Sequence, residues 1–167
     1  MQPTEPLDLI RRNAGLIHKI ARAYCRDATD REDVVQEIAV QLWRCHDRYD
    51  PAFRESTWIY RIALNVAISF HRRERRHQQR RTHIECDLLA ATAATEPSAQ
   101  VAQLLASIDD LATLDKALVL LWLDSNEHAV IADILGISVS NVGTKLMRIK
   151  DRLRAAMSAR ARAEDTK

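Results

Sequence analysis

Apolar residues recur at three- and four-residue steps along most of the chain, and this spacing constrains the fold more than any other feature of the sequence. In residues 7–24 the stripe consists of Leu7, Ile10, Ala14, Ile17, Ile20, Ala21 and Tyr24. Such spacing places its members on one face of an amphipathic helix. The 167 residues include only 3 Gly and 4 Pro, too few for the many tight turns of a sheet protein. We therefore expect an all-α protein.

Two more amphipathic helices are expected in the first half of the chain. Residues 30–44 form one, and its predicted inward side chains are Val34, Val35, Ile38, Leu42 and Trp43. Asp30 and Asp33 suit the positive end of the dipole of this helix. The sequence Asp50-Pro51 then interrupts the pattern, because proline disfavours a helical residue before it. Residues 53–77 form the next helix, with a predicted buried face of Ile59, Ile62, Ala63, Val66 and Phe70.

A change in composition predicts two domains. Between Gln78 and Ser98 the periodicity fades into small and polar residues that end at Pro97, which is typical of a linker. Periodicity resumes at Val101 and continues to Ala156. We expect a helical domain at 1–80, an acidic linker rich in small residues at 81–98, a second helical domain at 99–160 and a disordered tail at 161–167.

The second domain carries the spacing of a helix-turn-helix. Ala132 is small enough for two helices to cross, Gly136 suits a left-handed turn, and Ser138 can cap the next helix. The next helix has a predicted buried stripe of Val142, Leu146, Ile149 and Leu153. Its other face holds Ser140, Asn141, Thr144, Lys145 and Arg148, which suits base edges and phosphates. The alternative is the solvated face of an ordinary helical hairpin.

Charge is segregated, and this too favours nucleic acid as a partner. Residues 71–81 carry a net charge of +5, residues 82–110 carry −5, and residues 145–162 carry +6. In the helix at 53–77, Arg61, Asn65, Ile68 and Arg72 share an outward stripe near Trp58 and Tyr60. Rings that stack on unpaired bases, an amide that reads a base edge and guanidinium groups that hold the backbone suit single-stranded nucleic acid. The alternative is that Trp58 and Tyr60 are core residues.

Other classes of protein lack support in the sequence. The three cysteines have no C-x-x-C spacing, so free thiols are expected, although Cys45 and His46 could supply two metal ligands. A phosphate-binding glycine loop, an H-E-x-x-H motif and a clustered carboxylate pair are lacking, so we expect no enzymatic activity, cofactor or metal. Neither a signal peptide nor an apolar run of about 18 residues is found, which favours a cytoplasmic protein.

Two segments resemble bacterial sigma factors. Residues 30–37, Leu42-Trp43-Arg44, residues 58–67 and Arg72-Arg73 are similar to the domain that binds core polymerase and melts promoters. Residues 131–142, with Arg148 and Leu153, are similar to the helix-turn-helix of these proteins that binds promoters. The order of the two segments and the short linker between them resemble the extracytoplasmic-function (ECF) subgroup.

The resemblance implies a non-enzymatic subunit whose partners are promoter DNA and core RNA polymerase, through its β′ coiled coil and β flap. The implied polymerase-binding residues are Asp30, Glu32, Asp33, Gln36 and Glu37, with Trp43 buried behind them. The implied contacts to the minus-ten element are Tyr49, Phe53, Thr57, Trp58, Tyr60, Arg61, Asn65 and Arg72. The implied contacts to the minus-thirty-five element are Ser140, Asn141, Thr144, Lys145 and Arg148. The acidic linker would run toward the active-site and RNA-exit channels of the polymerase. An anti-sigma factor is a family expectation that no residue here supports by itself.

Departures from the family pattern bear on specificity. Residues 127–130 lack the usual hydroxyl cap of the first helix in the helix-turn-helix, so we expect Ser125 or Asn126 to cap it. Gly143 occupies a position that often holds a basic residue, although glycine within a helix costs about 1 kcal/mol. It could let the helix lie close to the DNA backbone. The alternative function is a stand-alone helix-turn-helix regulator, which would need a dimer interface and a palindromic site.

Overall fold

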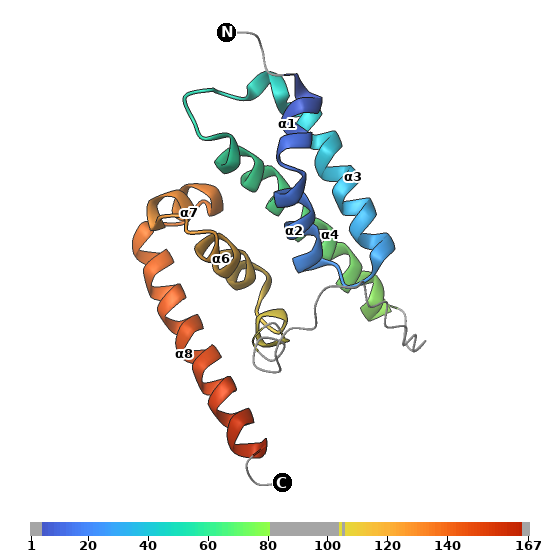
Figure 1. The fold of residues 1–167 in the computed structure, drawn as a ribbon. Coiled ribbons are helices and arrows are strands. Elements are labelled where there is room, and N and C mark those ends of the chain that lie inside the picture. Colours follow the sequence, from blue (N-terminus) through green and yellow to red (C-terminus); the bar gives the residue numbers. More distant parts are fainter. Residues whose placement is uncertain (1–4, 81–103, 105, 165–167) are drawn as a thin grey trace. The chain divides into compact units, whose positions relative to one another are not determined.

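The computed structural model describes residues 5–80, 104 and 106–164, and every regular element in them is helical, which confirms the all-α prediction. The chain divides into two compact units, Met1–Ala91 and Thr92–Lys167 (Figure 1). The predicted linker at 81–98 lies outside the described residues, so its structure stays a prediction.

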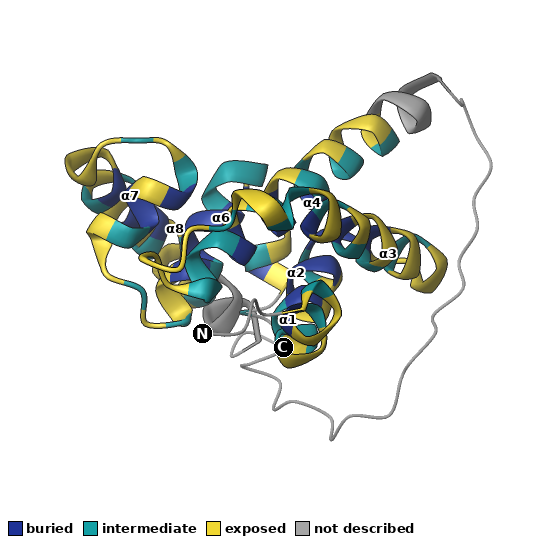
Figure 2. Cartoon of the chain, turned by 90° about the horizontal axis from the view of Figure 1, so that it is seen from above, coloured by how far each residue is buried: buried dark blue, intermediate teal, exposed yellow. Residues whose placement is uncertain are grey.

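The N-terminal unit consists of α1 (Pro6–Arg12), α2 (Ala14–Tyr24), α3 (Ala28–Cys45), the 3₁₀ helix η1 (His46–Arg48) and α4 (Glu55–Arg80). Helices α2, α3 and α4 pack against one another in pairs, and α1 packs on α3. Their shared core contains Leu9, Ile17, Ile20, Val34, Ile38, Leu42, Ile59, Ala63, Leu64 and Ala67. Figure 2 shows this core as the buried inner sides of the helices, with exposed residues on their outer sides.

Two predictions about the first half of this unit are wrong. The expected continuous helix over residues 7–24 ends at Arg12, and Asn13, with φ −107°, separates α1 from α2. Within α1, Leu9 is buried while Leu7 is 58% exposed, since side chains two residues apart along a helix point to nearly opposite sides. Trp43, expected to face inward, is 65% exposed. Its neighbour Leu42 fills the core, and one residue further along a helix points about 100° away.

The buried face of α4 is rotated from the predicted one. Ile59 and Ala63 are buried as expected, but Ile62, Val66 and Phe70 are only half-buried. Tyr60, Leu64 and Ala67 are buried instead. The reason is that α4 packs on α2 and on α3, so two neighbours share its buried surface.

The C-terminal unit consists of α6 (Thr113–Leu123), α7 (His128–Leu135) and α8 (Val139–Glu164), preceded by a helical stretch at 106–109. Each of the three labelled helices packs on the other two. Leu118, Leu121, Ile131, Val142 and Leu146 are the centre of the core. Helix α8 continues to Glu164, into the segment expected to be a disordered tail.

Within the described residues, no single helix has the length and apolar character of a membrane span. Helix α7 and residues Val139–Ser158 of α8 reach that composition only together, as a pair bent by 102°. The apolar side chains Ile131, Val142 and Leu146 of this pair are buried inside the unit.

Candidate functional site

The turn between α7 and α8 has the geometry predicted from Ala132, Gly136 and Ser138. Gly136 adopts the left-handed conformation, with φ 66° and ψ 36°. The Ile137 amide then donates to the Ala132 carbonyl oxygen at 3.1 Å. The Ser138 hydroxyl oxygen accepts a hydrogen bond from the Asn141 amide at 3.2 Å, which caps α8. The turn thereby fixes the direction of α8 relative to α7.

The prediction that Ser125 or Asn126 caps α7 is wrong. Glu127 occupies the cap position, and its side chain makes no capping hydrogen bond. Ser125 has φ 59°, and the Asn126 side-chain amide donates to the Leu121 carbonyl oxygen at 2.9 Å. These two residues therefore close the turn after α6.

Helix α8 buries one face and exposes the polar one. Val142, Leu146 and Ile149 are buried and Leu153 is half-buried. On the other side, Ser140, Asn141, Thr144 and Arg148 are exposed, as expected for groove contacts. Lys145 differs, because its ammonium group lies 3.2 Å from the Asp115 carboxylate of α6 and its side chain is partly buried.

Gly143 is not required by packing within this unit. A Cβ atom built there would lie 3.9 Å from the His128 ring, which is ordinary van der Waals contact. Since its backbone is helical, an alanine methyl group fits at this position. Packing within the unit therefore gives no reason for a glycine here.

The outer side of α3 is acidic and carries two exposed apolar residues that the sequence patterns missed. Glu32, Asp33, Gln36 and Glu37 are exposed, and Asp30 is half-buried. Burial, helped by the nearby Asp27, Glu74 and Asp33 carboxylates, raises the pKa of Asp30. Val40 and Trp43 are exposed on the same helix. We call the surface of Asp30, Glu32, Asp33, Gln36, Glu37, Val40 and Trp43 the α3 face.

Helix α3 begins at Ala28, earlier than predicted, because Asp27 caps it. The Asp27 carboxylate accepts hydrogen bonds from the Thr29 amide at 2.8 Å and from the Asp30 amide at 3.2 Å. These two backbone donors, first that of Asp30, hold the pKa of Asp27 below its usual range. The cap sets where the acidic residues of the α3 face begin.

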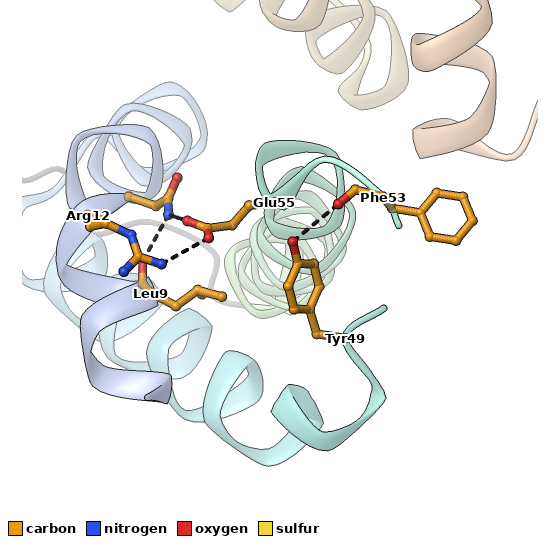
Figure 3. A network of polar contacts seen from close by, with 6 residues as sticks. Leu9, Arg12, Tyr49, Phe53 and Glu55 are labelled. Carbon is orange, nitrogen blue, oxygen red and sulfur yellow. Dashed lines mark hydrogen bonds and ion pairs between the residues drawn. The ribbon is translucent and has the colours of Figure 1, made fainter. Parts of the chain in front are cut away.

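The loop between η1 and α4 is ordered by its own side chains. The Tyr49 hydroxyl donates to the Phe53 carbonyl oxygen at 3.2 Å, and the Asp50 carboxylate accepts from the Ala52 amide at 2.9 Å. The Tyr49 ring also packs on Trp58, with 5.2 Å between centroids. Phe53 is 61% exposed, and Figure 3 shows its ring directed away from these contacts. The loop therefore presents an aromatic ring to solvent.

A polar network anchors the first turn of α4 (Figure 3). The Glu55 carboxylate lies 3.0 Å from the Arg12 guanidinium and accepts a second hydrogen bond from the Asn13 side-chain amide. Asn13 also donates to the Leu9 carbonyl oxygen at 2.9 Å. The break between α1 and α2 is thus tied to the residue that follows the loop, a link without a local sequence signal.

The predicted minus-ten residues on α4 are not all accessible. Arg61, Asn65 and Arg72 are exposed, and Thr57 and Trp58 are half-buried. Tyr60 is only 3% exposed, and its hydroxyl oxygen lies 3.4 Å from the Lys19 ammonium nitrogen. The expectation that its ring stacks on a base is therefore wrong for this conformation, because the ring belongs to the core.

A groove of about 640 Å³ between α3 and α4 connects two predicted sites. Its lining includes Glu37 from the polymerase-binding set and Asn65 and Arg72 from the minus-ten set. Cys45 also lines it, but no group of three potential metal ligands occurs within the described parts of the chain. The groove is lined by the Glu37 carboxylate and by the Arg72 and Arg73 guanidinium groups, so it can contact both positively and negatively charged groups of a partner.

Comparisons with known proteins agree with the motifs. Residues 9–77 match the Sigma-70 region 2 family. The sigma factor CnrH of Cupriavidus metallidurans is 28% identical, with 90% of this chain and 85% of CnrH covered. The ECF sigma factor SigM of Mycobacterium tuberculosis is 26% identical, with 93% of this chain and 72% of SigM covered.

Two solved structures share the fold. One is the sigma factor RpoE of Bartonella quintana in complex with the anti-sigma factor NepR, with a TM-score of 0.74, 17% identity and coverage of 89% and 94% of the two chains. The other is CnrH with the cytosolic domain of CnrY, with a TM-score of 0.67, 24% identity and coverage of 92% and 88%. Together with the helix-turn-helix, the region 2 match and the sigma-factor relatives support an ECF sigma factor of RNA polymerase.

Proposed function

We propose that the two units divide promoter recognition between them, with the N-terminal unit holding polymerase and unpaired DNA and the C-terminal unit binding the minus-thirty-five duplex. As a sigma factor the chain binds RNA polymerase and directs initiation at promoters. For the N-terminal unit, the observation that carries the proposal is the α3–α4 groove, where Glu37 and Asn65 line one cavity. A polymerase contact and a base-reading amide at one groove would couple binding of the enzyme to melting.

The α3 face suits a basic helical partner with an apolar contact, as we propose for the β′ coiled coil. Its carboxylates give complementarity to Lys and Arg, which mainly sets orientation and association rate. Trp43 adds the aromatic anchor typical of interface hot spots.

For the minus-ten element we propose Phe53 and Trp58 as the stacking rings. Asn65 would read a base edge while Arg61 and Arg72 hold phosphates. The Tyr49 and Glu55 contacts would keep the loop and the first turn of α4 in place while the duplex opens.

In the C-terminal unit, α8 would lie in the major groove with Ser140, Asn141 and Thr144 near base edges and Arg148 near a phosphate. Linkage through the polymerase would raise the effective concentration of each weakly binding unit. We therefore expect the free protein to bind duplex DNA poorly.

The test uses purified core polymerase on genomic DNA with mapping of new start sites. A polymerase that initiates at the same places with and without the protein would refute the proposal. On a promoter found in this way, Asn65→Ala and Trp58→Ala should keep polymerase binding but cut permanganate reactivity of the melted thymines. Tyr60→Phe retains the buried ring and is the matched control, expected to melt the promoter as the wild type does.

Reversing charge at Asp33 and Glu37 should instead weaken the polymerase complex itself. Co-elution with polymerase at wild-type strength would remove the α3 face from the interface. The helix-turn-helix alone would fit a stand-alone regulator, but such a regulator has no use for a region 2 domain.

An anti-sigma protein is a further proposed partner, since a solved structure that shares the fold was obtained with one. The polymerase β flap is the proposed contact of the C-terminal unit. The acidic linker at 81–98 is proposed to lie along a basic channel of the enzyme.

A further inference from the structure

A second, smaller cavity lies in the C-terminal unit between α6 and α8. It has a volume of about 240 Å³, and its lining consists of Asp115, Lys145, Arg148, Ile149 and Arg152. Lys145, Arg148 and Arg152 are three or four residues apart and therefore share one side of α8. The buried Ile149 lies on the same side and lines the cavity with them. With one carboxylate against three cations, the cavity keeps a net positive charge.

The contacts inside the cavity are unequal. Lys145 is held at 3.2 Å by Asp115, and both side chains are partly buried. Arg152 has only a long hydrogen bond of 3.5 Å to the Asp110 carbonyl oxygen. Among the described residues no carboxylate pairs with Arg148 or Arg152. Two guanidinium groups thus remain available for an anion.

We infer that this cavity binds one backbone phosphate of duplex DNA and that Asp115 regulates the binding. The Asp115 carboxylate occupies the Lys145 ammonium group in place of a second phosphate. The inference rests on the proposed function of α8. Guanidinium groups match phosphate oxygens in geometry as well as charge, so Arg148 and Arg152 are the direct ligands. Ser140, Asn141 and Thr144 are exposed on the same helix, so a duplex bound there brings its backbone to the cavity.

Asp115 has two effects on DNA. Its charge repels an incoming phosphate, and its ion pair keeps Lys145 from making a phosphate contact. Asp115 therefore lowers the sequence-independent part of DNA affinity, which helps to keep the free protein off DNA. It acts through Lys145 and is a regulatory residue, whereas Arg148 and Arg152 contact the DNA.

The salt dependence of DNA binding tests this, because each phosphate contact contributes about −0.9 to the slope of log K against log salt concentration. The experiment measures fluorescence anisotropy of a labelled mixed-sequence duplex with the full-length protein, from low to moderate NaCl, without polymerase. Asp115→Asn should bind more tightly and steepen the slope by about 0.9. The double variant Arg148→Ala/Arg152→Ala should make the slope shallower by about the same amount.

Two further variants separate regulation from simple structure. Lys145→Met should leave the slope of the wild type unchanged, because Asp115 already holds this side chain, and the double variant Asp115→Asn/Lys145→Met should return to the wild-type slope. Arg154→Ala removes a cation of the same helix that pairs with Asp151 at 3.0 Å, and it should change nothing. Circular dichroism would verify that each variant folds. If Asp115→Asn does not fold, the double variant Arg148→Ala/Arg152→Ala still tests whether the cavity binds a phosphate.

Several outcomes would overturn the inference. A folded Asp115→Asn with the wild-type slope would make the ion pair purely structural, and a shallower slope for Lys145→Met alone would make Lys145 a direct contact. Inorganic phosphate that competes with the duplex beyond its ionic-strength effect, through Arg148 and Arg152, would indicate a small-anion site instead. Because no polymerase is present, these outcomes are independent of whether the protein selects promoters.

Discussion

Truncating Trp43 to alanine separates a core role for this residue from a role in binding polymerase. The sequence pattern placed the ring inward, whereas the structure leaves it 65% exposed. Of the roughly 250 Å² of a tryptophan side chain, about 90 Å² is then covered within the unit. Its loss should cost less than about 2 kcal/mol of unfolding free energy. A fully buried tryptophan would cost about 3–5 kcal/mol.

The effect on polymerase binding should be larger. The remaining surface of about 160 Å² is available to a partner. Covering it contributes about 4 kcal/mol at about 25 cal/mol per Å², from which ordering the side chain removes roughly 0.5–1.5 kcal/mol. Because alanine keeps part of this surface, we expect a net loss of about 2–3 kcal/mol, or roughly 30- to 150-fold weaker binding.

The assay pairs equilibrium titration of labelled protein with core polymerase and chemical denaturation followed by circular dichroism. Leu7→Ala, on α1, is the matched control, because it removes an apolar side chain that is 58% exposed but outside the α3 face. Ile38→Ala, in the core, gives the signature of a buried truncation. Wild-type affinity of Trp43→Ala, or a stability loss as large as that of Ile38→Ala, would refute the reasoning.

Three further predictions follow from single contacts. Asp27→Ala should destabilise the N-terminal unit at neutral pH while Asp27→Asn does not. Since folding lowers the pKa of Asp27, its stabilising effect is present above the unfolded-state pKa and is lost as the pH falls through the folded-state value, so the stability difference between the wild type and Asp27→Ala should shrink in acid denaturation curves. Gly143→Ala should stabilise the C-terminal unit by up to about 1 kcal/mol, measured by denaturation, since the added methyl fits; a loss of stability would show hidden crowding. Burial, with a smaller effect of Asp30, raises the pKa of Cys25 to about 11, so iodoacetamide at pH 8 should leave it unmodified in the folded protein, as peptide mass spectrometry would show.

Sequence reasoning succeeded where the structure is decided by neighbours along the chain. Gly136 and Ser138 determine the turn through local backbone geometry and a local hydrogen bond, so both could be predicted from their spacing. Val142, Leu146 and Ile149 form the predicted buried stripe of α8. The all-α fold follows from the same periodicity.

The errors occur where packing partners decide. Periodicity gives the repeat of a stripe but fixes its centre only loosely, and a one-residue change moves a side chain by about 100°. That is why Trp43 was expected beside Leu42 in the core and why Tyr60 was expected outside. Helix α4 packs on both α2 and α3, so its buried surface is broader than a single stripe predicts.

The ion pairs are harder still to predict from sequence, because their partners are far apart along the chain. They position side chains and helix ends more than they stabilise the fold. Arg12 and Glu55, 43 residues apart, have side chains that are 52% and 30% exposed. An ion pair this exposed contributes at most about 1 kcal/mol. It nevertheless fixes where α4 starts after the Phe53 loop, as Asp115 fixes Lys145 beside the phosphate cavity. Removing such a pair should therefore change DNA binding more than it changes the free energy of unfolding.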